Sequence, residues 1–228
     1  MRTLETTDKI FFESAGLDRD RVTRLVGEAL GDVDDGELFL EYCQSESISF
    51  DDGRIRSASF DTAHGFGLRA VCGEATGYAH ASELSEQAIR RASAAVQAVR
   101  TGHDGTLAGP PAPTNRSLYT DENPLGENPF ESKVKLLAEI DAYARKQDSR
   151  IKQVTASLSG EWQAVQILRP DGYRVADIRP LVRLNVSIVC AEGDRMETGS
   201  HGVGGRMSYA TFIDPSAWQA QVDEALRQ

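Results

Sequence analysis

The residues best suited to bind another molecule lie in a glycine-rich run from Gly199 to Arg206. The run reads GSHGVGGR and ends in an arginine. Because glycine has no Cβ, its backbone can approach another chain closely and adopt positive φ. The amides of such a run could hold the carbonyls of a peptide or an anion, with Arg206 nearby. The alternative is that these glycines only mark an irregular strand end.

We predict a substrate-binding surface formed by this run and by a neighbouring alternating segment, residues 182–190. On the polar side of that segment, Arg183 is accompanied by Asn185 and Ser187. This side either lines a groove or faces solvent, and the sequence leaves both open. An earlier pair of glycines, in Gly65-Phe66-Gly67, has the same ambiguity. The predicted substrate-binding residues are Gly202, Gly204, Gly205, Arg206 and Arg183.

Recognisable signatures of a catalytic or metal site are missing from the sequence. No histidine belongs to an H-E-x-x-H pattern, and there is neither a G-x-S-x-G nor a C-x-x-C motif. We interpret the three cysteines as small buried hydrophobes in strands. We expect no metal ligand and no catalytic residue in this chain. The histidines are His64, His80, His103 and His201, and the cysteines are Cys43, Cys72 and Cys190.

Composition narrows the function classes further. The chain has 228 residues, 40% of them hydrophobic, and a formal net charge of −10. Such an acidic balance argues against binding nucleic acid by neutralising phosphates. The N-terminus lacks the apolar core of a signal peptide, and no apolar run approaches the roughly 18 residues of a membrane span. We therefore expect a cytoplasmic protein that binds neither nucleic acid nor membrane.

The sequence pattern of the first half predicts a helix, then several strands and then a second helix. Asp18 is a candidate N-cap for a helix that ends at Gly31. A period of two begins at Glu37, with a hairpin turn at Asp52-Gly53. A short strand, TGYAHA, completes the meander, and a helix follows over residues 85–100.

The second half repeats this alternation after a linker at residues 101–128, which is rich in Pro and Gly. Residues 128–131 resemble a capping box with Pro129 at the first helical position. Strands follow from Val154 onwards. The remaining signals are a turn at Pro170-Asp171-Gly172, the strand 182–190, and a last helix capped by Asp214-Pro215.

These elements predict an α+β fold, with antiparallel β-meanders packed against helices. Residues 1–100 and 129–228 follow a similar order of elements, and we interpret this as an internal duplication joined by the 101–128 linker. The alternative is that any two meanders with helices would look equally similar.

Several motifs resemble the TldD/PmbA family, which includes bacterial and archaeal zinc metallopeptidases. They are ELFLEY, GFGLRAVCGEATGYAHA, VTASLSG, ADIRPLVRLNVSIV and GVGGR, in this order. The match lies closer to the TldD branch than to PmbA/TldE and covers most of the chain. It implies the N-terminal portion of the family fold, while the family's C-terminal domain carries an H-E-x-x-x-H helix and a later cysteine that bind zinc.

No position here matches those zinc ligands, so we expect the C-terminal zinc domain to be absent and the isolated chain to be inactive. The resemblance implies the substrate-binding and assembly part of a peptidase that degrades unfolded peptides or processes peptide leaders. The implied partner is a TldE/PmbA-like paralogue, with self-association as the other option. The alternative function is a non-catalytic peptide-binding or regulatory partner of the gyrase-modulator type.

Overall fold

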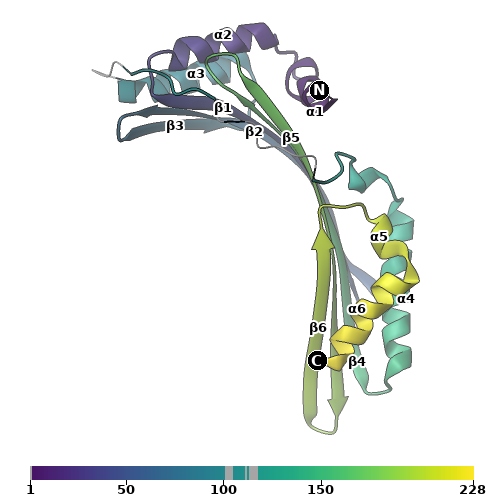
Figure 1. Ribbon diagram of the computed structural model, residues 1–228. Coiled ribbons are helices and arrows are strands. Elements are labelled where there is room, and N and C mark those ends of the chain that lie inside the picture. The colour runs from purple at the N-terminus through teal and green to yellow at the C-terminus, as the bar shows by residue number, and fades with distance from the viewer. Residues whose placement is uncertain (1, 101–104, 111, 113–117) are drawn as a thin grey trace. The chain divides into compact units, whose positions relative to one another are not determined.

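The computed structural model describes residues 2–100, 105–110, 112 and 118–228. His103 and part of the predicted linker lie outside the described residues. Six strands form one antiparallel sheet in the order β3-β2-β1-β4-β5-β6, which confirms the predicted α+β class (Figure 1). The strands are β1 (Asp35–Asp51), β2 (Arg54–Cys72), β3 (Ala75–Ala81), β4 (Ile151–Leu168), β5 (Arg174–Glu192) and β6 (Arg195–Gly205).

Helices and helical turns connect the strands. The α-helices are α1 (Arg2–Asp8), α2 (Arg19–Leu30), α3 (Glu86–Val96), α4 (Phe130–Gln147), α5 (Ala210–Ile213) and α6 (Pro215–Arg227). A π-helical turn, η1 (Lys9–Glu13), follows α1 directly. The two 3₁₀ turns are η2 (Gln97–Arg100) and η3 (Pro124–Gly126).

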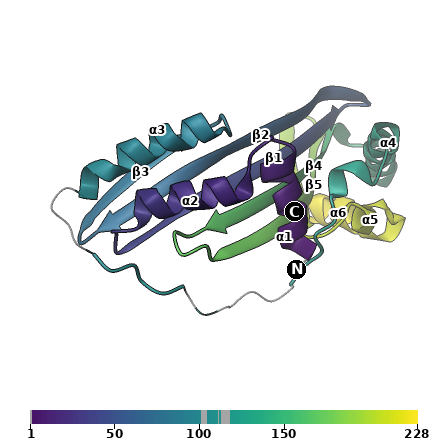
Figure 2. The ribbon, with the colours of Figure 1, turned by 90° about the horizontal axis from the view of Figure 1, so that it is seen from above.

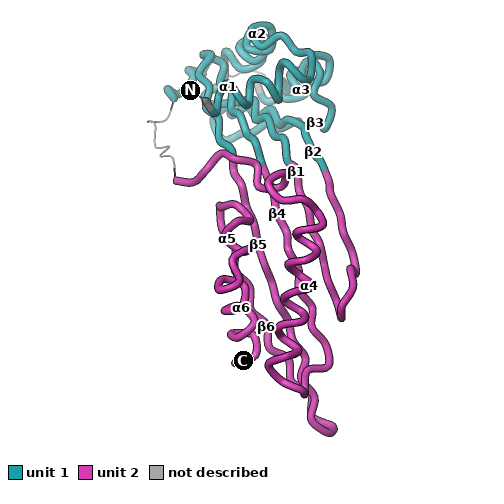
Figure 3. The backbone as a smooth tube through the Cα atoms, turned by 90° about the vertical axis from the view of Figure 1, so that its right-hand side faces the viewer, with its two compact units in different colours: residues 1–43, 62–117, 163–178 teal, residues 44–61, 118–162, 179–228 magenta. Residues whose placement is uncertain are grey.

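The chain folds as two compact units, each built from three segments (Figure 3). Unit 1 comprises Met1–Cys43, Thr62–Ser117 and Gln163–Ile178. Unit 2 comprises Gln44–Asp61, Leu118–Trp162 and Arg179–Gln228. Strands β1, β2, β4 and β5 each contribute residues to both units. The duplication of residues 1–100 and 129–228 stays a prediction.

In unit 1, α2 and α3 pack on one face of the sheet (Figure 2). Alternate residues of β1 and of the last part of β2 are buried beneath them, including Leu38, Leu40 and Leu68. Asp18 caps α2 as predicted, because its Oδ1 accepts a hydrogen bond from the Arg21 amide at 2.8 Å. Cys72 is buried here, whereas Cys43 is partly exposed. The expectation of burial is also wrong for Cys190, which lies partly exposed in unit 2.

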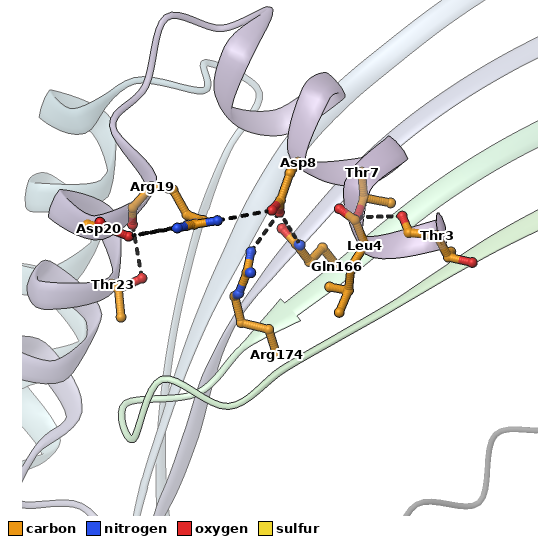
Figure 4. Close-up of polar contacts among 9 residues, drawn as sticks. All are labelled: Thr3, Leu4, Thr7, Asp8, Arg19, Asp20, Thr23, Gln166 and Arg174. Atoms are coloured by element: carbon orange, nitrogen blue, oxygen red, sulfur yellow. Dashed lines mark hydrogen bonds and ion pairs between the residues drawn. The ribbon is translucent and has the colours of Figure 1, made fainter. Parts of the chain in front are cut away.

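Helix α1 was not predicted, and contacts distant in sequence tie it to unit 1. Figure 4 shows the Asp8 carboxylate at its end, between side chains of three other segments. Asp8 accepts from Arg174 at 2.6 Å, from Gln166 at 2.8 Å and from Arg19 at 3.4 Å. These partners lie 11 to 166 residues away in the sequence, so no local pattern predicts the contacts.

In unit 2, α4, α5 and α6 pack beside the strands, and each of them buries apolar side chains (Figure 1). The hairpin turn at Asp52 and Gly53 is confirmed, with positive φ at both residues, as a type I′ turn requires. Asp214 caps α6 as predicted. The capping box at residues 128–131 is wrong, since Pro129 occupies the N-cap and no side chain caps α4.

A charged pair is buried beneath α4. The Lys133 ammonium forms an ion pair with Glu46 and donates to the Leu125 carbonyl at 2.8 Å. It also lies 4.8 Å from the ring centroid of Tyr209. Burial raises the pKa of Tyr209, so this phenol stays neutral. Lys133 thus joins α4, β1 and the start of α5 in one polar contact.

Removing that ammonium should destabilise unit 2. We expect Lys133→Ala to lower the free energy of unfolding by about 3 kcal/mol, because Glu46, whose side chain is only 12% exposed, would lose the partner of its charge. Urea unfolding followed by tryptophan fluorescence reports on this unit, since Trp162 and Trp218 both belong to it. The exposed Lys135, two residues along α4, provides the control variant Lys135→Ala. Equal losses in both variants would contradict the role of the buried pair.

Candidate functional site

The sheet of unit 2 has a polar face opposite the residues buried by its helices. Along β5, Val182, Leu184 and Val186 are buried, whereas Arg183 is exposed and Asn185 partly exposed. The neighbouring β4 shows the same alternation. We call this polar surface the open face of unit 2. The side chains that share it are Gln153, Thr155, Ser157, Arg183, Asn185 and Ser187.

The glycine-rich run does not form a loop. Residues 199–205 belong to strand β6 and pair with β5 residue by residue, from Gly199 opposite Ile188 to Gly205 opposite Val182. None of these glycines has positive φ, so that expectation is wrong. The run is instead part of strand β6, and four of its seven residues in that strand are glycines without side chains.

Strand pleating divides the glycines between two faces. Gly202 and Gly204 lie opposite Asn185 and Arg183, so they share the open face. Gly205 lies opposite the buried Val182 and therefore shares the helix-covered face. Gly199 shares that face too, and a Cβ there would collide with the Ala225 carbonyl of α6.

Gly202 leaves room for side chains of β5 to lie across β6. Arg183 Nε donates to Asn185 Oδ1 at 2.7 Å, and Asn185 Nδ2 donates to Ser157 Oγ at 3.5 Å. A Cβ at position 202 would collide with Asn185 Oδ1 and lie 3.1 Å from Arg183 Nη2. The missing side chain therefore permits this row of polar groups.

The structure brings together three of the five predicted residues. Arg183, Gly202 and Gly204 lie together on the open face, whereas Gly205 faces the other way. Arg206 follows the end of β6, and its guanidinium lies 5.1 Å from the ring centroid of Tyr119.

Sequence reasoning missed Asp51 as a member of this surface. The sequence pattern assigns the Asp51-Asp52 pair to a turn, but Asp51 ends β1 and accepts from Gln153 and Thr155, each at 2.9 Å. These hydrogen bonds hold the pKa of Asp51 below its usual range. The available signal was the polar alternation of residues 153–157.

Strand β6 forms one edge of the sheet, since β5 is its neighbour in the strand order. Edge strands present main-chain N–H and C=O groups that can pair with another chain. In unit 2, Arg54–Asp61 of β2 lies towards the opposite edge, because the described pairing with β3 covers residues 66–72. The open face is thus bordered by two strands that can accept a partner strand.

Zinc does not fit the residues described here. Among them, no group of three or more His, Cys, Asp or Glu side chains is placed to hold a metal ion. His201, for example, has its Nδ1 at 2.7 Å from Gln221 Oε1, a contact within unit 2. No helix in the described ranges is long and apolar enough to cross a membrane.

Two family models match the chain in sequence. The model for the PmbA/TldA metallopeptidase domain 1 matches residues 36–99, and the model for the central domain matches residues 123–228. The chain belongs to the PmbA/TldD family. The resemblance noted from the sequence motifs is thereby confirmed.

Curated relatives of this PmbA/TldD chain carry the name Metalloprotease TldD homolog. The protein from Haemophilus influenzae is 37% identical over 187 residues, which cover 80% of this chain and 38% of the relative. The protein from Buchnera aphidicola subsp. Schizaphis graminum is 32% identical over 182 residues, covering 79% and 38%. The chain therefore spans well under half the length of these relatives.

Solved structures share the fold at low sequence identity. A putative modulator of DNA gyrase from Bacteroides thetaiotaomicron superposes with a TM-score of 0.71 at 15% identity, covering 91% of this chain and 49% of the other. TldE from Thermococcus kodakarensis gives a TM-score of 0.68 at 15% identity, with coverages of 91% and 46%. At this identity the likeness concerns the fold alone.

The two faces of β6 predict different outcomes for two equivalent substitutions. We expect Gly199→Ala to lower the free energy of unfolding by about 2 kcal/mol, because the methyl group would press on the backbone of α6. Gly202→Ala should change it by less than about 0.5 kcal/mol, because movable side-chain ends can yield. Tryptophan fluorescence in urea measures both variants. Similar losses in the two would contradict the assignment of faces.

Proposed function

We propose that the chain is the substrate-binding and assembly part of a TldD-like zinc metallopeptidase that degrades unfolded peptides or processes peptide leaders. Membership in a metallopeptidase family and the names of the curated relatives support this proposal. In it, zinc and its ligands belong to a part of the enzyme outside residues 1–228, and this chain alone cleaves nothing. The role of its own residues is to bind and orient a peptide.

The observation that carries the binding role is the edge strand β6 with its glycines. An extended peptide that pairs with β6 would gain main-chain hydrogen bonds, which tolerate many side-chain sequences. Gly202 and Gly204 place no side chain of their own on the open face beside that edge, and the ends of Arg183 and Asn185 lie over Gly202, where they can meet a bound peptide. Arg183 is exposed next to these glycines and can donate to a peptide carbonyl or carboxylate. Gly205 and Arg206 continue the same edge.

A partner role has separate support. Residues 54–61 of β2 are all exposed, and they include the apolar side chains Ile55 and Phe60. Exposed apolar groups on an edge strand are typical of a surface that pairs with another chain. We propose that this segment binds either a TldE/PmbA-like paralogue or a second copy of the chain. The cytoplasmic location stays a prediction.

The alternative function is a non-catalytic regulatory partner. It is favoured by the likeness of the fold to solved structures of putative modulators of DNA gyrase. Both functions use peptide or protein binding at strand edges, and they differ in whether a zinc-bearing domain acts together with this chain. Co-purification with a TldE-like chain in the absence of metal and of peptide cleavage would favour the alternative.

A larger side chain on the open face beside β6 should weaken peptide binding. We expect Gly202→Val to reduce the affinity for a fluorescein-labelled extended peptide without proline about tenfold, because its side chain would displace Arg183 and block the approach. Fluorescence polarisation measures the affinity. Gly193→Asn is the control, since Gly193 lies in the β5–β6 turn with open space around it and has a positive φ that asparagine tolerates. Unchanged affinity in Gly202→Val would contradict the proposed site.

The exposed apolar side chains of β2 should drive association. We expect the chain to self-associate at high concentration and the variant Phe60→Ser to shift it towards the monomer, because Phe60 is 58% exposed. Sedimentation velocity measures the species present. Ser57→Ala, in the same exposed stretch, is the matched control. A chain that stays monomeric at every concentration measured would contradict this prediction.

A further inference from the structure

A pocket of about 380 Å³ lies within unit 1, far in sequence from the glycines of β6. It extends over three strands, with β2 as its floor. Two glycines of that strand, Gly65 and Gly67, are among its lining residues. The lining includes Phe39, Glu41 and Cys43 of β1 and Tyr78, His80 and Ser82 at β3.

Strand register explains the hollow. Gly67 pairs with His80, and Arg69 pairs with Tyr78, so these side chains belong to one face. A Cβ on Gly67 would lie 2.6 Å from Tyr78 Oη, which shows that the tyrosine ring lies over this glycine. A Cβ on Gly65 would lie 2.6 Å from the Ala81 carbonyl oxygen. The glycines therefore allow β3 and the Tyr78 ring to lie close against β2.

One wall of the pocket is aromatic. The rings of Tyr78 and His80 stack with centroids 5.7 Å apart and an interplanar angle of 28°. Tyr78 is 64% exposed, which is unusual for so large a side chain on a sheet. Phe39 lines the pocket from β1 and is partly exposed. Such rings present electron-rich faces that attract cations.

The charge in the pocket is negative. Glu41 is the single carboxylate among the described residues that line it. Its Oε1 accepts from Gln163, and its Oε2 accepts from no other described residue. The neighbouring Arg69 does not neutralise it, because Arg69 is held by Glu37 at 2.7 Å and by Asp35 at 2.6 Å.

We propose that this pocket binds a basic side chain, lysine or arginine, of a peptide. A carboxylate beside aromatic faces is complementary to an ammonium or guanidinium group on an aliphatic stem. The pocket of about 380 Å³, lined from β1 to β3, has room for that stem. The proposal concerns unit 1 alone and does not depend on peptide binding at β6.

The test compares acetylated, amidated Ala-Lys-Ala with the same peptide carrying norleucine, which has a similar stem and no charge. Chemical shifts of the isotopically labelled chain locate and quantify binding. We expect the lysine peptide to bind roughly tenfold more tightly and to shift the signals of Gly65, Gly67 and Tyr78. In Glu41→Gln the preference for lysine should disappear, and in Tyr78→Ala it should fall several-fold.

Two control variants separate this pocket from the other proposals. Glu74→Gln removes an exposed carboxylate in the β2–β3 turn and should leave the preference unchanged. Gly202→Val, at β6, should leave it unchanged as well. Equal affinity for the two peptides would overturn the proposal, as would an undiminished preference in a folded Glu41→Gln. A preference lost in Gly202→Val alone would also overturn it and would assign the basic side chain to β6.

Discussion

Helices cover one face of this antiparallel sheet in each unit, and this one-sided burial is the constraint on which the rest of the structure depends. In unit 2 it forces the strict alternation of β5, where Val182, Leu184 and Val186 enter the core and Arg183, Asn185 and Ser187 do not. The buried face provides the stability, because α4 and α6 cover it with apolar side chains. The open face is left free to carry polar groups. In unit 2, a binding function of the sheet therefore falls to this face or to the strand edges.

Glycines adjust the sheet at the points where its neighbours come closest. Gly199 lets α6 approach β6 on the buried face, and Gly202 lets Arg183 and Asn185 lie across β6 on the open one. Gly65 and Gly67 act likewise in unit 1, where they form the floor of the pocket beside Tyr78. The same residue type thus allows a helix to pack on one face and polar side chains to lie across the strand on the other.

Local sequence signals predicted much of the fold. The cap at Asp18, the type I′ turn at Asp52-Gly53 and the alternation of β5 each depend on residues next to one another, and all are confirmed. Features that depend on residues distant in sequence were either not predicted or predicted incorrectly. Helix α1 is held by contacts to Gln166 and Arg174, and α4 begins without the predicted capping box.

The candidate site could likewise be predicted only where it depends on local residue types. Residue types pointed to β6, but only the register with β5 reveals that Gly202 and Gly204 share a face with Arg183 while Gly205 does not. Asp51 and the pocket around Glu41 and Tyr78 arise from strands that meet through pairing, which composition does not encode.

The most direct test of the central claim is amide hydrogen exchange along β6, measured with and without an unfolded peptide. Pairing with the outer edge would engage the amides of β6 that point away from β5, which lie at alternate positions of an antiparallel strand. The account predicts slower exchange at alternate amides within residues 199–205 when the peptide is present. Unchanged exchange throughout β6, under conditions where the peptide is bound, would contradict it.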